Sequence, residues 1–100
     1  MIKLSVILIT RNEEKNIRNF LECVKWADEI VVIDQSSTDK TVDICKKYTE
    51  RVFVVEPKGY CEPDRMMAIS KARGEWILYM DADERASAEL KNEILATISG

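Results

Sequence analysis

Four short apolar runs constrain the fold of this chain more than any other feature of its sequence. They occupy residues 4–9 (LSVILI), 30–33 (IVVI), 52–55 (VFVV) and 76–80 (WILYM). The apolar residues in each run follow one another instead of alternating with polar ones, a pattern typical of strands buried on both faces of a parallel sheet. We therefore expect four buried parallel strands.

A helical pattern follows the first run. Asn12 is expected to be its N-cap, with Glu13 and Glu14 in the first turn, where carboxylates interact favourably with the helix dipole. The apolar residues of this segment recur at the spacing of one helix face: Ile17, Phe20, Leu21 and Val24.

Three further helices are expected. The second should begin near residues 36–39, where Ser36 and Asp39 have the spacing of a capping box. Its buried residues should be Thr41, Ile44, Cys45 and Tyr48. The third should start at Pro63 and stop before Gly74, which can cap it in the left-handed conformation. The fourth should start near residue 87 and bury Leu90, Ile94, Leu95 and Ile98.

This alternation of strands and helices predicts an α/β fold with a doubly wound, mainly parallel sheet and right-handed crossovers. One hundred residues, of which 46% are hydrophobic, are enough for one core. Residues 1–100 are therefore expected to form a single domain.

Composition excludes several classes of protein. The 15 basic and 18 acidic residues give a net charge of -3, which argues against a nucleic-acid partner. Cys23, Cys45 and Cys61 are widely spaced and the chain has no histidine, so neither a zinc site nor a disulfide framework is expected. The first apolar run is too short for a membrane span. We expect a cytoplasmic protein with reduced thiols.

Polar clusters follow all four apolar runs, at residues 10–13, 34–37, 56–59 and 81–84. In an open parallel sheet, ligands bind outside the carboxyl ends of the strands. The four clusters should therefore meet at one edge of the sheet and form the site.

The chain has only three glycines, so it can form neither a G-x-G-x-x-G turn nor a Walker-type phosphate loop. A divalent cation, Mg²⁺ or Mn²⁺, is the alternative means of holding phosphates. Asp81 and Asp83, spaced i and i+2 after the fourth run, are the candidate ligands. A solvated turn that caps the next helix explains the spacing equally well, but two like charges at the end of a buried strand favour a cation.

The other candidate residues also have structural alternatives. Asp34 could accept hydrogen bonds from a ribose or a base, or could instead form an Asx-type turn onto the serines that follow it. Thr10 and Asn12 could meet the same ligand, although Asn12 could simply cap a helix. Arg65 is either a surface residue or a forked donor to a diphosphate.

Three ordered motifs carry a resemblance to a known family. They are LSVILITRNEE, EIVVIDQSSTDKT and R-x8-GEWILYMDADE, and together they extend over nearly the whole chain. The pattern resembles the N-terminal, nucleotide-binding half of family 2 of the GT-A glycosyltransferases, whose fold is Rossmann-like. The segment KWADE at residues 25–29 is most similar to the sugar transferases of the lipopolysaccharide core.

The resemblance implies roles for individual residues. The segment Thr10, Arg11 and Asn12 would border the base, and Asp34 would contact the nucleoside. Arg65 would lie near the diphosphate. Two positions depart from the family pattern, since Gln35 replaces an Asp that reads uracil and Ser36 replaces a Gly. The amide of Gln35 could suit uracil, guanine or thymine.

The resemblance further implies that Asp81 and Asp83 hold a divalent metal, with Asp83 as the direct ligand. The donor would be a nucleotide diphosphate sugar, transferred with inversion to a glycan or lipid-linked acceptor at the inner face of the membrane. The general base of the family lies well downstream of the D-x-D pair, so we expect no catalytic base in this chain and place it beyond Gly100. The 100 residues should bind a nucleotide weakly without turning over a sugar donor.

Other functions also use such residues. A haloacid-dehalogenase phosphatase has a D-x-D motif, but after its first strand, and a nucleotidyltransferase requires a glycine-rich first loop. A non-catalytic binding module is the third alternative. Because the sheet edge and the helix over residues 90–98 could expose apolar surface, self-association is also expected.

Overall fold

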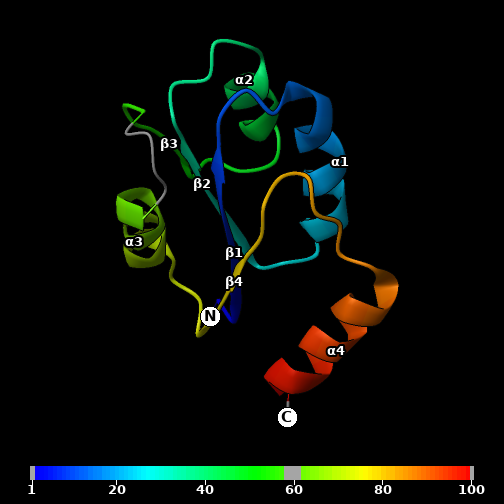
Figure 1. Cartoon of the computed structure of the whole chain (residues 1–100). Coiled ribbons are helices and arrows are strands. Elements are labelled where there is room, and N and C mark those ends of the chain that lie inside the picture. Colours follow the sequence, from blue (N-terminus) through cyan, green and yellow to red (C-terminus); the bar gives the residue numbers. More distant parts are fainter. Residues whose placement is uncertain (1, 58–61, 100) are drawn as a thin grey trace.

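The computed structural model describes residues 2–57 and 62–99. Its four strands form one parallel sheet in the order β3-β2-β1-β4 (Figure 1). The strands are β1 (Leu4–Thr10), β2 (Glu29–Asp34), β3 (Val52–Val54) and β4 (Trp76–Tyr79). A helix follows each of them: α1 (Glu14–Val24), α2 (Thr41–Cys45), α3 (Glu62–Lys71) and α4 (Ala88–Ser99). The predicted order of elements and the parallel α/β fold are confirmed.

Helices cover both faces of the sheet (Figure 1). On one face, Val6 and Leu8 of β1 pack in a cluster with buried residues of α1 and α2 and with partly buried residues of α4. On the other face, Ile7 packs with Ala68 of α3. Because successive side chains of a strand point to opposite faces, one uninterrupted apolar run supplies both layers of the core.

The strands differ in burial in a way that the sequence did not predict. All of β2 and nearly all of β1 are buried, as expected for the two central strands. The outer strands are not, and Trp76 and Ile77 of β4 remain 46% and 41% exposed. The prediction of four fully buried strands was therefore wrong for β3 and β4, because each has a neighbouring strand on one side only.

Helix α1 buries the four predicted residues, Ile17, Phe20, Leu21 and Val24. The predicted N-cap was wrong, because Glu13 occupies the N-cap position without a side-chain capping bond. Asn12 instead has a left-handed backbone, with a φ of 53°, and its side chain accepts a hydrogen bond from the Thr38 N–H. Asn12 therefore links the loops after β1 and β2 instead of capping the start of α1.

Helix α2 begins later than predicted and lacks the predicted capping box. Ser36 has a φ of 53° and its hydroxyl donates to the Val55 carbonyl, so it cannot cap α2. Of the two predicted capping residues, only Asp39 bonds to the start of α2, where its side chain accepts a hydrogen bond from the Thr41 N–H at 2.9 Å. Thr41, Ile44 and Cys45 are buried as expected. Tyr48, which is half-buried, lies beyond the end of the helix.

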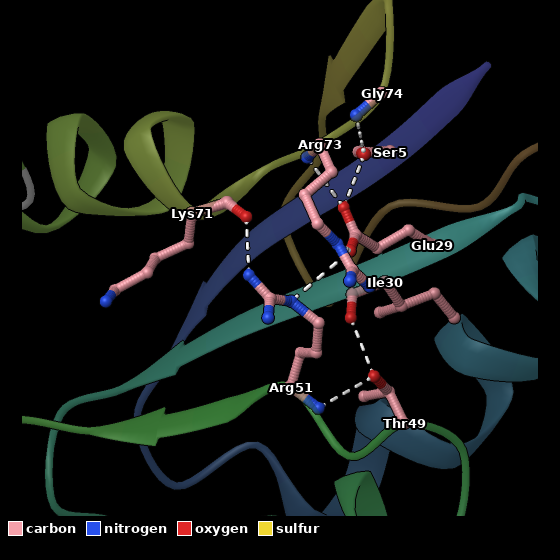
Figure 2. A network of polar contacts seen from close by, with 8 residues as sticks. All are labelled: Ser5, Glu29, Ile30, Thr49, Arg51, Lys71, Arg73 and Gly74. Atoms are coloured by element: carbon pink, nitrogen blue, oxygen red, sulfur yellow. Dashed lines mark hydrogen bonds and ion pairs between the residues drawn. The ribbon is translucent and has the colours of Figure 1, made fainter. Parts of the chain in front are cut away.

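The end of the sheet opposite the strand carboxyl ends is held by a buried carboxylate (Figure 2). Glu29 accepts hydrogen bonds from the Ser5 hydroxyl at 2.7 Å, and from the Arg73 backbone N–H at 2.9 Å and side-chain Nε at 2.6 Å. It also forms an ion pair with Arg51, whose Nε lies 3.2 Å away. Glu29 thereby ties β1, β2, the residue before β3 and the α3–β4 connection together.

Gly74 has a different role from the predicted left-handed cap, since its φ lies outside the left-handed region. Its N–H donates to the Ser5 hydroxyl at 2.9 Å. A Cβ atom here would lie 2.7 Å from both the backbone nitrogen and the hydroxyl of Ser5. Close approach of the α3–β4 connection to β1 is therefore what requires glycine.

Helix α4 is less buried than predicted. Ser87 accepts the Leu90 N–H and so caps the first turn, but no residue of α4 is fully buried and Leu95 is 43% exposed. An apolar groove of about 240 Å³ separates α4 from β4. None of the helices described in residues 2–57 and 62–99 combines the length and the apolar character needed to cross a bilayer.

Candidate functional site at the carboxyl ends of the strands

Asp34 lies at the centre of the junction between β1 and β2. Thr10 and Asp34 are register partners at the ends of these strands, and the Thr10 hydroxyl donates to Asp34 Oδ1 at 2.7 Å. The Ser37 N–H and hydroxyl donate to the same carboxylate at 2.8 and 2.6 Å. Asp34 is fully buried by these contacts, so it forms the turn that the sequence allowed as its alternative role.

The loop after β1 and the loop after β2 are fastened to each other. The Asn12 N–H donates to the Ser37 hydroxyl at 2.8 Å, and the Asn12 side chain accepts from the Thr38 N–H at 2.7 Å. Arg11, beside them, is exposed. Two non-glycine residues with left-handed backbones, Asn12 and Ser36, lie in these loops, and such strain persists where the surrounding contacts determine the conformation.

Gln35 points to the opposite face of the sheet from Asp34. Its Nε2 donates to Asp64 Oδ2 of α3 at 2.7 Å, and both side chains are buried. Asp64 was not predicted from the sequence, because a separation of 29 positions along the chain conceals the contact. An acidic residue in the first turn of α3 was the only signal, and it is explained equally well as a favourable helix-dipole charge.

The D-x-D segment forms a turn at residues 82 and 83. Ala82, between the two acids, is 1% exposed and packs in the main apolar cluster, whereas Asp81 and Asp83 are both exposed. The Asp81 N–H donates to Glu84 Oε1 at 2.7 Å, and the Glu84 N–H donates to the Asp81 carbonyl at 2.9 Å. This closed turn presents two carboxylates to solvent.

Arg65 and Asp81 both contact Tyr79, a residue that the sequence analysis did not single out. The Arg65 guanidinium carbon lies 4.8 Å from the centre of the Tyr79 ring, and the Tyr79 hydroxyl donates to Asp81 Oδ1 at 3.1 Å. Burial, followed by the hydrogen bond to Asp81 and its charge, raises the pKa of Tyr79, so the hydroxyl stays protonated and remains a donor at neutral pH. Its position at the end of the strand, two residues before Asp81, was the available signal.

The donor set fits a hard cation that shares its coordination with a ligand. Among the described residues, no group of three or more acidic, histidine or cysteine side chains converges on one point. Mg²⁺ commonly takes one or two protein carboxylates and completes its shell with phosphate and water oxygens. Asp81 and Asp83 provide that number of carboxylates, in the exposed position that such sharing requires.

Residues 5–99 match the model of the family described as "Glycosyl transferase family 2". The chain belongs to glycosyl transferase family 2. An uncharacterized glycosyltransferase of Rickettsia typhi is 41% identical over 95 residues, which cover 94% of this chain and 32% of that protein. The lipopolysaccharide core biosynthesis glycosyltransferase LpsC of Rhizobium meliloti is 33% identical, with coverage of 95% and 38%.

Solved structures of a related protein confirm the fold. The crystal structure of Staphylococcus aureus TarS 1-349 superposes with a TM-score of 0.79 at 32% identity, covering 97% of this chain and 32% of that one. TarS has also been crystallised with UDP and with UDP-GlcNAc. The present chain spans about a third of the length of these proteins.

Proposed function

We propose that residues 1–100 are the donor-binding part of a longer family 2 glycosyltransferase that transfers a sugar from a nucleotide diphosphate sugar. The observation that carries this proposal is the meeting of three groups at one edge of the sheet. They are the fastened loops after β1 and β2, the Arg65–Tyr79 contact, and the two exposed carboxylates after β4. The UDP and UDP-GlcNAc complexes of TarS support a nucleotide sugar as the donor.

The proposed ligand extends from the loops toward the D-x-D turn. Thr10, Arg11 and Asn12 border the nucleoside, in loops whose shape Asp34 maintains. Arg65 lies on the diphosphate side, where its positive charge offsets phosphate charge. With Tyr79 holding one oxygen of Asp81, the turn keeps the two carboxylates in place for a cation.

Asp83 and Asp81 are the residues that would hold Mg²⁺ or Mn²⁺. When bound, the cation supplies Lewis-acid neutralisation of the charge that develops on the leaving nucleoside diphosphate. We further propose inversion at the anomeric carbon, with a general base that lies beyond Gly100. The acceptor would be a glycan or a lipid-linked glycan of the cell envelope, as the names of LpsC and TarS suggest for those proteins. A cytoplasmic enzyme at the inner face of the membrane fits this reaction.

Thermal unfolding with nucleotides tests the proposal. The chain is titrated with UDP, GDP and dTDP, each with and without Mn²⁺. A ligand that binds only the folded state at ten times its Kd adds about 1.4 kcal/mol of stability. That gain corresponds to a rise in Tm of about 6–11 °C for a domain of this size.

We expect the rise to require Mn²⁺ and to disappear in Asp83→Asn. Glu75→Gln is the control, because Glu75 is an exposed acid at the opposite end of β4. A chain whose Tm does not respond to any of the three nucleotides with Mn²⁺ has no donor site of the proposed kind.

A further inference from the structure

The buried contact between Gln35 and Asp64 fixes the orientation of an amide at the end of β2. Gln35 is 9% exposed and Asp64 1% exposed, and Gln35 Nε2 lies 2.7 Å from Asp64 Oδ2. The NH₂ group of Gln35 donates to Asp64, so the amide oxygen points the other way.

That oxygen is available for a ligand. Within residues 2–57 and 62–99, Gln35 uses its amide nitrogen for Asp64, and no donor to its amide oxygen is found. The oxygen is also not among the buried side-chain atoms that lack a partner, so solvent reaches it. This exposed oxygen on an otherwise buried side chain can accept a hydrogen bond from a donor group of a ligand.

We propose that Asp64 is a positioning residue that sets the base preference of the nucleotide site by turning the Gln35 carbonyl oxygen toward the base. This proposal rests on the proposed function, in which the loop after β2 borders the nucleoside. Uracil, thymine and guanine carry a ring N–H on their pairing edge, which this oxygen can accept. Cytosine and adenine present an acceptor at the equivalent ring nitrogen, so that two lone pairs would face each other.

Uridine and cytidine diphosphates are the matched probes, because their bases are nearly equal in size and differ at this edge. Calorimetric titration of the full chain with each diphosphate in the presence of Mn²⁺ gives two dissociation constants. The Gln35 oxygen accepts a hydrogen bond from uracil but meets another acceptor on cytosine. The loss of one hydrogen bond corresponds to about a tenfold tighter binding of UDP than of CDP.

Three variants separate positioning from a merely structural role. In Asp64→Asn, residue 64 can donate as well as accept, so the Gln35 amide is free to turn over and the UDP preference should fall toward one. Gln35→Met, which removes the amide but keeps its length, should lose the preference in the same way. The double variant D64N/Q35E should regain it, because the amide at position 64 can then donate to one oxygen of the new carboxylate and leave the other oxygen facing the base.

Each outcome bears on a different claim. Equal binding of UDP and CDP by the wild-type chain overturns the base-reading inference while the donor site stands. An unchanged preference in both Asp64→Asn and Gln35→Met also overturns it. If neither diphosphate binds with Mn²⁺, the proposed function fails and the inference fails with it. Circular dichroism of each variant identifies any that does not fold, and Gln35→Met then decides the question.

Discussion

Replacing Glu29 by glutamine tests the structural account of the sheet, because it keeps the shape of the side chain and removes its charge. The Glu29 side chain is 3% exposed and forms ion pairs with two arginines, whose Nε atoms lie at 2.6 Å for Arg73 and 3.2 Å for Arg51. In the variant, the ion pairs lose their negative charge. An NH₂ group also replaces either Oε2, the acceptor that both arginine Nε atoms share, or Oε1, the acceptor of the Ser5 hydroxyl and the Arg73 N–H.

The expected cost is about 3 kcal/mol, at the low end for breaking a buried ion pair, because the Arg73 side chain is 58% exposed and partly screened. A loss of this size lowers Tm by roughly 12–24 °C in a domain of about 100 residues. Urea unfolding followed by circular dichroism at pH 7 measures it. Glu22→Gln is the control, since Glu22 makes an exposed ion pair with Lys25 and should change little.

The pH dependence of the same variant provides a second check. Burial alone would raise the pKa of Glu29, but the hydrogen bonds from the Arg73 N–H, the Ser5 hydroxyl and the Arg73 guanidinium hold this pKa below its usual 4.5. A lowered folded-state pKa means that the stabilisation is present above the unfolded pKa and is lost as pH falls through the folded one. The gap between wild type and Glu29→Gln should therefore shrink below pH 4.5. A gap under about 1 kcal/mol at pH 7, or one that is the same at pH 7 and pH 3, would show that the Glu29 charge does not stabilise the sheet.

Two further predictions concern other parts of the fold. Gly74→Ala forces a Cβ atom to within 2.7 Å of Ser5 and should lower the unfolding free energy by about 1–3 kcal/mol in urea titrations. A cost below about 0.5 kcal/mol would show that the α3–β4 connection can move away from β1. Burial, with a smaller contribution from the Asp34 charge, raises the pKa of the Cys45 thiol to about 12 from 9.0. Since the thiol ionises at lower pH in the unfolded chain, the unfolding free energy should fall between pH 9 and 12. Cys45→Ala should show a shallower fall over this range. Equal slopes in the two proteins would contradict an origin in the Cys45 thiol.

The sequence predicted the order of the elements because each apolar run and each helical face is a local pattern. The spacing of Ile17, Phe20, Leu21 and Val24 identified the buried face of α1 in full. Burial of the outer strands and of α4 could not be predicted in the same way. An apolar run such as 76–80 looks the same whether its strand is central or at an edge, and the strand order is settled only by the tertiary fold.

The positions of the polar clusters were predicted for the same reason. They could be located by the rule for strand ends, and the first, second and fourth do lie at the carboxyl edge. Contacts between distant segments were missed, because Ser36 takes up a left-handed backbone and Asp64 reaches Gln35 only once α3 has packed on the sheet.

Some sequence predictions fall on residues outside the described ranges. Residues 58 and 59 of the third polar cluster are among them, as is Cys61. Gly100 also lies outside these ranges, and the expectation that the catalytic base follows it stays a prediction.

Backbone amide NMR spectra of the chain, recorded with UDP in the presence and absence of Mg²⁺, test the donor site most directly. UDP with Mg²⁺ should shift the amide signals of residues 10–12, 35–38 and 81–84 together. Without Mg²⁺, the changes at residues 81–84 should be lost. Shifts confined to the groove between β4 and α4, or shifts at residues 81–84 that do not depend on Mg²⁺, would contradict a metal-assisted nucleotide site at the carboxyl edge of this sheet.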